Sequence, residues 1–210
     1  MERTKMTLKD LAVSFRFPKF STSRDLYKAF GCRVCMLLSY QIISVYQLYI
    51  IEDYVHQTKT EAAGPIATMS IITMVVSLTA SLISGPISDK MHTRKVPVII
   101  ASLLFAIGTA MPWTMPSVTG MYLNAGIAGF SYGVYSAIDQ ALNVDVLPNK
   151  EEAGKDLGIL NLATTLGQAV GPTITSVVKT TTGTYTPAFA ISIIMTVCAA
   201  VFVLRIQKVK

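Results

Sequence analysis

The sequence has little charge. Asp, Glu, Lys and Arg make up 14% of its 210 residues, whereas about a quarter of a typical soluble domain is charged. Hydrophobic residues reach 51%, and the mean hydropathy is +0.50. The apolar residues fall in runs of about 20, which is long enough to cross a hydrocarbon core about 30 Å thick. This composition excludes an ordinary soluble domain and indicates an integral membrane protein.

Cysteine and histidine are also rare. Cys32, Cys35 and Cys198 are too few, and their settings too apolar, for a disulfide framework. Cys32 and Cys35 form a C-x-x-C pair, but no strand precedes it, so helix packing explains the pair better than a redox or metal site does. The two histidines, His56 and His92, lie in loops on opposite faces. With no ATP-binding loop and no hydrolytic or metal motif, the sequence predicts a protein that is not an enzyme and uses no cofactor or metal.

The N-terminal segment lacks the apolar core of a signal peptide. Residues 1–26 are polar and basic with scattered Leu and Phe residues, and Pro18 interrupts them. We expect this leader either to lie at a membrane surface or to act as a loosely ordered cytoplasmic tether. Residues 27–210 are predicted to form a six-helix transmembrane bundle. The chain therefore divides into a basic leader, or linker, and one membrane domain.

Six apolar segments follow the leader. Such segments must be helical in lipid, because their backbone groups have to be satisfied within the segment. The predicted fold class is therefore all-α and integral to the membrane. The predicted spans are residues 27–51, 63–88, 96–113, 117–147, 157–178 and 185–206.

The positive charge gathers on one side of these spans. All but two of the 18 Lys and Arg residues fall in or near the leader, the C-terminus and the loops of one side. The other side receives only Lys59 and Lys179. Because cytoplasmic loops carry an excess of Lys and Arg, we expect a multi-pass protein of the cell (plasma) membrane with both termini in the cytoplasm. The net charge of +6 then reflects topology rather than nucleic-acid binding.

The fourth span is the least apolar. Its polar side chains are spaced by seven and then by four residues, which places them along one helical face with Tyr132 beside it. A carboxylate at membrane depth is costly unless it faces a wet cavity or a partner. Asp139 is therefore either a proton site, cation site or gate in a solute cavity, or a structural carboxylate neutralised by water, Arg33 or Lys150. The stripe consists of Asn124, Ser131, Tyr135, Asp139 and Asn143.

Further polar residues lie in the first and fifth spans. Aromatic rings stack on C–H faces and amides bind hydroxyl groups, so this mixture suits a sugar-like or other polar organic solute. The alternative is plain packing between helices. The residues assigned to a substrate or cation pathway are Tyr40, Gln41, Tyr46, Gln47, Asn124, Tyr132, Tyr135, Asp139, Asn161 and Gln168.

A short charged stretch joins the second and third spans. Residues 85–95 read Gly-Pro-Ile-Ser-Asp-Lys-Met-His-Thr-Arg-Lys, and their charges predict a tight turn outside the lipid. The spacing Gly-x3-Asp-Lys-x3-Arg-Lys resembles the loop signature of the major facilitator superfamily, although His92 stands where that family usually has Gly. In the fifth span, the Gly-x3-Gly pair of residues 167 and 171 predicts a tight crossing with a neighbouring helix. With the proline that follows, the Gly-x3-Gly-Pro pattern at residues 167–172 resembles an element of the same family's fifth helix.

Longer stretches, within residues 24–49 and 135–161, resemble the C-terminal half of bacterial, sugar-cation symporter-like members of this family. The resemblance implies one half of a major facilitator fold, with a solute site between two six-helix halves. It also implies a conformational latch in which Asp89 accepts hydrogen bonds from the fifth span near residues 156–158. The alternative is that these charges only set topology. The residues of the latch loop are Gly85, Asp89, Lys90, Arg94 and Lys95.

The resemblance also implies a function. We expect one half of a secondary transporter that moves a small polar organic solute, for example a sugar-like one, by alternating access and by symport with protons or another cation. Because the chain supplies one half, we expect it to be a fragment or split product, to pair with a separate N-terminal half, or to pair with a second copy of itself. The alternative function is a non-transporting membrane partner or scaffold, or a degenerate transporter fragment.

Overall fold

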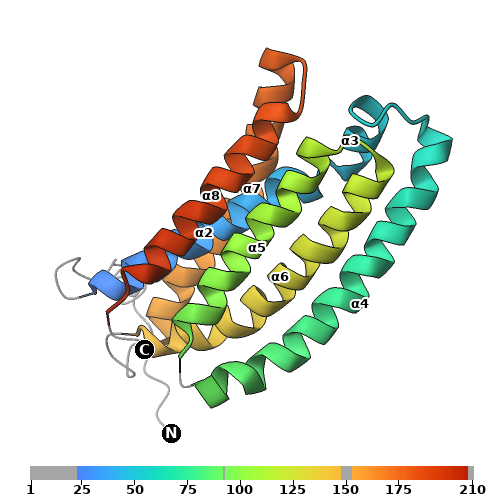
Figure 1. Ribbon diagram of the computed structural model, residues 1–210. Helices are drawn as coiled ribbons and strands as arrows, with labels where there is room; N and C mark the ends of the chain where they lie inside the picture. The colour runs from blue at the N-terminus through green and yellow to red at the C-terminus, as the bar shows by residue number, and fades with distance from the viewer. Residues whose placement is uncertain (1–22, 92, 148–152, 208–210) are drawn as a thin grey trace, which may run out of the picture.

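The computed structural model describes residues 23–91, 93–147 and 153–207, and their regular structure is entirely helical (Figure 1). Most of the predicted leader, together with His92 and Lys150, lies outside the described residues. Residues 24–26, which were assigned to the leader, instead begin the first described helix. The helices are α2 (Arg24–Ser44), α3 (Gln47–Asp53), α4 (Lys59–Met91), α5 (Lys95–Thr114), α6 (Val118–Asp145), α7 (Ala153–Thr182) and α8 (Thr186–Leu204).

These helices make six units of membrane-spanning length, which confirms the predicted all-helical fold. α4, α5 and α8 are long and apolar enough to cross a membrane, and α2 with α3 qualifies as one bent span. α6 and α7 have 28 and 30 residues, but they are too polar to meet the same criterion. Their polarity indicates that these two helices face other parts of the protein or water more than they face lipid.

The first predicted span is broken, which corrects the prediction of one continuous helix over residues 27–51. The axes of α2 and α3 differ by 47°. At the break the backbone N–H of Tyr46 donates to the carbonyl of Ile43, an i to i−3 bond of 3.2 Å in place of the regular i to i−4 bond. Residues 41–47 contain neither Pro nor Gly, so the sequence carried no sign of the bend.

The predicted tight turn over residues 85–95 is shorter than expected. Residues 85–91 continue α4 as helix, and only residues 92–94 separate it from α5. Pro86 lies inside α4 without ending it. A proline in a membrane helix removes one backbone N–H donor, and neighbouring groups can satisfy the carbonyl that loses its partner. With 33 residues, α4 is about 50 Å long, which exceeds a hydrocarbon core of about 30 Å. Its charged last turns therefore extend past the lipid while remaining helical.

The helices pack in the order α4, α6, α5, α8, α2, α7. Exchanging α2 with α6, α4 with α7 and α5 with α8 leaves this set of neighbours unchanged. The first three spans, which are α2 with α3, α4 and α5, thus correspond to α6, α7 and α8, and each span runs opposite to its counterpart. The bundle is therefore built as an inverted repeat. The start of α2 and the end of α8 lie at the same end (Figure 1). That end is called the inner end below, and the opposite end the outer end.

Glycines allow several of these helix pairs to approach closely. A Cβ on Gly133 of α6 would lie 2.4 Å from the carbonyl oxygen of Ser77 in α4. On α7, a Cβ on Gly167 would lie 2.6 Å from the Cβ of Leu37, and Gly171 is as close to Gln41 of α2. Such small residues bring helix backbones together where lipid provides no hydrophobic drive between helices. The predicted close packing by the Gly-x3-Gly pair of α7 is confirmed.

A methyl group added at the α4–α6 crossing should destabilise the bundle. We expect Gly133→Ala to lower the free energy of unfolding by about 1–3 kcal/mol, because α4 has to move away. Gly126→Ala on the same helix is the matched control, since a Cβ there meets nothing within 4 Å, and it should be neutral or gain up to about 1 kcal/mol. Thermal unfolding in mild detergent measures both, and equal melting temperatures would contradict the close crossing.

Candidate functional site

A buried carboxylate lies in the inner part of α6. Asp139 is 4% exposed, although it belongs to a span-length helix. The hydroxyl of Tyr135 donates to its Oδ1 at 3.0 Å, and the amide of Asn143 donates to its Oδ2 at 3.0 Å. Both partners stand four residues away on the same face, so the predicted spacing of the stripe is what creates these contacts.

The countercharge comes from α2. The Nη1 atom of Arg33 lies 3.5 Å from Oδ2 of Asp139, and the side chains of both residues are more than nine-tenths buried. The Nε–H of Arg33 donates to the hydroxyl of Thr164 in α7 at 3.1 Å. One guanidinium group thus connects α2, α6 and α7. Arg33 was one of the partners predicted for Asp139, and the structure shows this contact. Lys150, another predicted partner, lies outside the described residues.

The contacts around Asp139 allow its carboxylate to exchange one partner for another. The contact between Arg33 and Asp139 is longer than the roughly 2.7–2.9 Å of a charge-assisted hydrogen bond, so it is an ion pair without a direct hydrogen bond. The buried Oδ1 of Asn143 has no hydrogen-bond partner within the described residues. The carboxylate can therefore gain a proton, and the amide can accept a donor, without breaking an existing strong bond.

Aromatic rings cover the network on its outer side. The rings of Tyr40 and Tyr132 are stacked with centroids 4.1 Å apart, and Tyr132 also lies 6.4 Å from the ring of Tyr135. Phe105 of α5 completes this cluster at 6.3 Å from Tyr40. The rings connect α2, α5 and α6 on the outer side of the ion pair.

A small cavity of about 30 Å³ lies beside the break between α2 and α3. Tyr40, Gln47 and Asn124 are among the residues that line it. The amide of Asn124 donates to the carbonyl of Gly108 in α5 at 3.0 Å, so this side chain holds two helices together. A volume of this size can hold about one water molecule and is too small for an organic solute.

The remaining stripe and pathway residues are dispersed. Ser131 donates to the carbonyl of Ala101 in α5, so it joins two helices as Asn124 does. Gln41 packs against Gly171, and Tyr46 lies at the outer end, 6.3 Å from the ring of Tyr185.

Two residues of the predicted pathway lie on the surface of α7. Asn161 and Gln168 are exposed there, away from the buried network, and Thr165 between them is exposed as well. The structure therefore brings Tyr40, Tyr132, Tyr135 and Asp139 together and leaves Asn161, Thr165 and Gln168 on a separate face of α7.

Two members of the network were absent from the predicted pathway. Arg33 was considered only as a structural partner of Asp139, and Thr164 was not assigned a role in it. A signal for Arg33 existed, because a cation nine residues into a span-length helix needs a partner inside the bundle. Thr164 carried no such signal, since many threonines occur in these helices.

The charges of the latch loop form a different contact from the one predicted. Nε of Arg94 lies 2.5 Å from Oδ2 of Asp145 at the end of α6, and its Nη2 lies 3.5 Å from Oδ1 of Asp89. The side chain of Asp89 is 68% exposed and faces Arg94 rather than the start of α7. Because α4 stays helical to Met91, Asp89 projects from its last turns toward the next helix. Gly85 and Lys90 belong to α4, and Lys95 begins α5.

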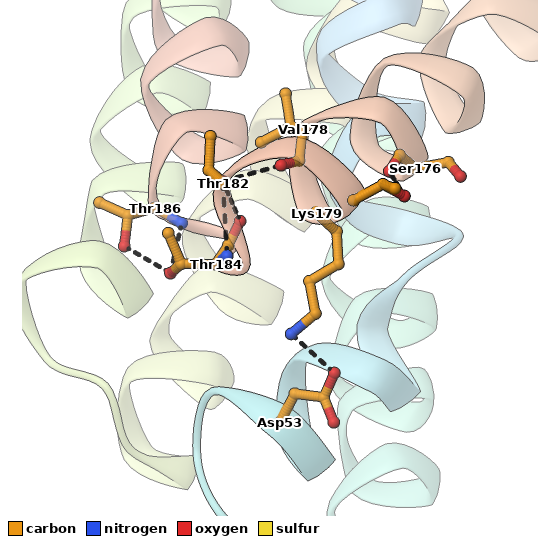
Figure 2. A network of polar contacts seen from close by, with 8 residues as sticks. Asp53, Ser176, Val178, Lys179, Thr182, Thr184 and Thr186 are labelled. Atoms are coloured by element: carbon orange, nitrogen blue, oxygen red, sulfur yellow. Dashed lines mark hydrogen bonds and ion pairs between the residues drawn. The ribbon is translucent and has the colours of Figure 1, made fainter.

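A second charged contact closes the outer end (Figure 2). Nζ of Lys179 near the end of α7 lies 2.9 Å from Oδ2 of Asp53 in α3, and 4.5 Å from the ring centroid of Tyr185. The Lys179 ammonium group thus fastens the bent segment α3 to α7 and to the start of α8. Within the described residues, no group of three or more His, Cys, Asp or Glu side chains is placed to hold a metal ion.

Comparisons with known proteins agree with this architecture. Residues 29–210 match the family profile of the Major Facilitator Superfamily. The uncharacterized MFS-type transporter C18.02 of Schizosaccharomyces pombe is 27% identical over 149 residues, which is 71% of this chain and 33% of that protein. The chain therefore spans about a third of the length of this curated relative.

A solved structure is similar in fold. The in meso crystal structure of the POT family transporter PepTSo superposes with a TM-score of 0.72 at 17% identity. The match covers 92% of this chain and 39% of that chain. At this identity the likeness establishes the fold alone.

Removing the countercharge of Asp139 should destabilise the bundle. We expect Arg33→Ala to cost about 3 kcal/mol, because an uncompensated buried carboxylate remains. The double variant Arg33→Ala/Asp139→Asn should recover part of that loss, giving a coupling energy above about 1 kcal/mol. Unfolding in mixed detergent micelles measures the cycle. Additive effects of the two substitutions would show that the ion pair does not hold α2 to α6.

Proposed function

The chain belongs to the major facilitator superfamily, and on that premise we propose that it forms one six-helix half of a secondary transporter. The complete assembly moves a small polar organic solute across the membrane by alternating access. Its solute site lies between this half and a second one, as in transporters built from two such halves. A second half covers the exposed apolar side chains of α4, among them Met74, Leu78 and Leu82.

The observation that supports this proposal best is the buried ion pair between Arg33 and Asp139. Packing alone does not require it, because apolar residues of similar volume stabilise a core at least as well. Ionisable residues inside membrane bundles mark ion or substrate pathways. The pair also lies where α2, α6 and α7 meet, so a change in its charge acts on three helices at once.

A proton or another cation is proposed as the coupling ion. Binding of a proton to a carboxylate oxygen of Asp139 removes its negative charge and releases Arg33, which keeps its bond to Thr164. Arg33 then provides a cation for an anionic group of the solute, and α2 and α6 lose their main electrostatic link. Loss of the proton restores the pair and returns the helices to their first arrangement.

The polar surface of α7 is proposed as the wall that meets the solute. Asn161, Thr165 and Gln168 recur at steps of four and three, so they lie on one exposed face. Amide and hydroxyl groups of this kind bind polar solutes, sugars among them. The aromatic pair Tyr40 and Tyr132 is proposed to separate this wall from the ion pair.

The inner end is proposed to face the cytoplasm of a cell whose plasma membrane holds the protein. Within the described residues, the outer end has only Lys59 and Lys179 as cations. The inner part holds Arg24, Lys28, Arg33, Lys90, Arg94, Lys95, Lys155 and Arg205. This asymmetry is the bias that cytoplasmic loops show.

The coupling role of Asp139 is tested by Asp139→Asn in the complete assembly. Uptake of a panel of radiolabelled small polar solutes is followed in proteoliposomes with and without a proton gradient. We expect the variant to lose gradient-driven accumulation by at least about tenfold, while exchange of solute across the membrane continues. Unchanged uptake with an unchanged pH profile would remove Asp139 from the coupling mechanism.

The matched control is Glu61→Gln. Glu61 is an exposed carboxylate in the first turn of α4, where it accepts hydrogen bonds from Thr58. Glutamine preserves this capping contact, so the control removes a carboxylate without disturbing the helix. Accumulation should remain at the wild-type level.

A further inference from the structure

An apolar groove lies between α4, α5 and α6 near the inner end. Its volume is about 200 Å³, and Ser84 is the only lining residue with a polar side chain. The hydroxyl of Ser84 already donates to the carbonyl of Ser81. Among its lining residues the groove therefore offers no free hydrogen-bond donor to a polar solute, and none of these residues belongs to the network around Asp139.

The groove is elongated and open to the outside of the bundle. Ile83, Ile87 and Met91 of α4 line it at successive turns, over about 12 Å of helix. They are 55%, 49% and 46% exposed, and Ile100 and Phe130 on the facing helices are similarly open. A linear apolar chain fits such a surface better than a compact ligand does.

Two cations stand at the inner end of this groove. Lys90 precedes the lining residue Met91, and Lys95 comes two residues before the lining residue Pro97. Arg94 is already held by Asp89 and Asp145. Neither Lys90 nor Lys95 has an ion-pair partner among the residues that the structure describes.

We propose that this groove binds an anionic phospholipid, with an acyl chain along α4 and the phosphate group at Lys90 and Lys95. An amphiphile of this kind satisfies both features at once, because it carries an apolar chain and a negative group at one end. Another helix laid in the groove would cover the apolar residues and leave the two ammonium groups without a counter-ion. Each lysine near an anionic membrane surface increases affinity roughly fivefold, equivalent to about 1 kcal/mol.

Native mass spectrometry of the purified full chain tests the headgroup contact. The chain is given equal amounts of palmitoyl-oleoyl phosphatidylglycerol and phosphatidylcholine in mild detergent. We expect the wild type to retain phosphatidylglycerol preferentially, and Lys90→Gln/Lys95→Gln to lower that preference by on the order of tenfold. An unchanged preference in this variant would overturn the proposal.

The matched control removes two positive charges elsewhere. Arg24→Gln/Lys59→Gln lowers the net charge equally, but Arg24 begins α2, which packs on α7 and α8, and Lys59 begins α4 at the outer end. It should keep the wild-type preference for phosphatidylglycerol. An equal loss in this control would mean that overall charge, and not the groove, selects the lipid, which would also overturn the proposal.

A photo-crosslinking residue at Ile87 identifies the occupant of the groove in the membrane. Benzoylphenylalanine placed there should give a phospholipid adduct, because Ile87 lines the middle of the groove. An adduct with a polypeptide would show that a protein surface covers it, and the lipid site would be abandoned. This experiment does not depend on transport, so its result is independent of the proposed function.

Discussion

The negative charge of Asp139 sets the condition that the rest of the bundle has to meet. A carboxylate enclosed by protein is stable only when a cation and hydrogen-bond donors surround it. Tyr135 and Asn143 are supplied by the helix itself, but Arg33 must come from α2, which otherwise touches α6 only lightly. Besides the stacked rings of Tyr40 and Tyr132, this ion pair is therefore the main direct link between α2 and α6, and Thr164 extends it to α7.

Close helix crossings hold the partners of this contact in place. Gly133 lets α6 pack on α4, and Gly167 with Gly171 lets α7 pack on α2. Gly108 likewise brings α5 close to α6. The bundle thus contains two closely packed groups, α4 with α6 and α5, and α2 with α7, which α8 bridges and which Arg33 and Asp139 join near the inner end. Closely packed groups joined by an ion pair suit a protein that moves in large units rather than by local adjustment.

The sequence predicted the features that follow from hydropathy, helical spacing and residue size. The number of spans, the face that carries Tyr135 and Asp139, and the glycine crossing of α7 are of this kind. It missed the bend at Tyr46, because no Pro or Gly marks it. It also assigned residues 85–95 to a turn because of their charges, whereas α4 stays helical to Met91. The partner of Asp89 and the outward position of Gln168 depend on which helices become neighbours, and spacing along one helix does not contain that information.

The break between α2 and α3 divides the first span into two helices that differ in their stability against local unfolding. α3 has seven residues, too few for a helix to be stable through its own hydrogen bonds. Buried Ile50 and Ile51, with the contact of Asp53 to Lys179, hold it in place. Local opening of α3 therefore requires far less free energy than opening of α2, so its backbone amides exchange with deuterium through brief local melting while α2 remains protected. The outer end of the bundle can thus loosen without unfolding the inner end.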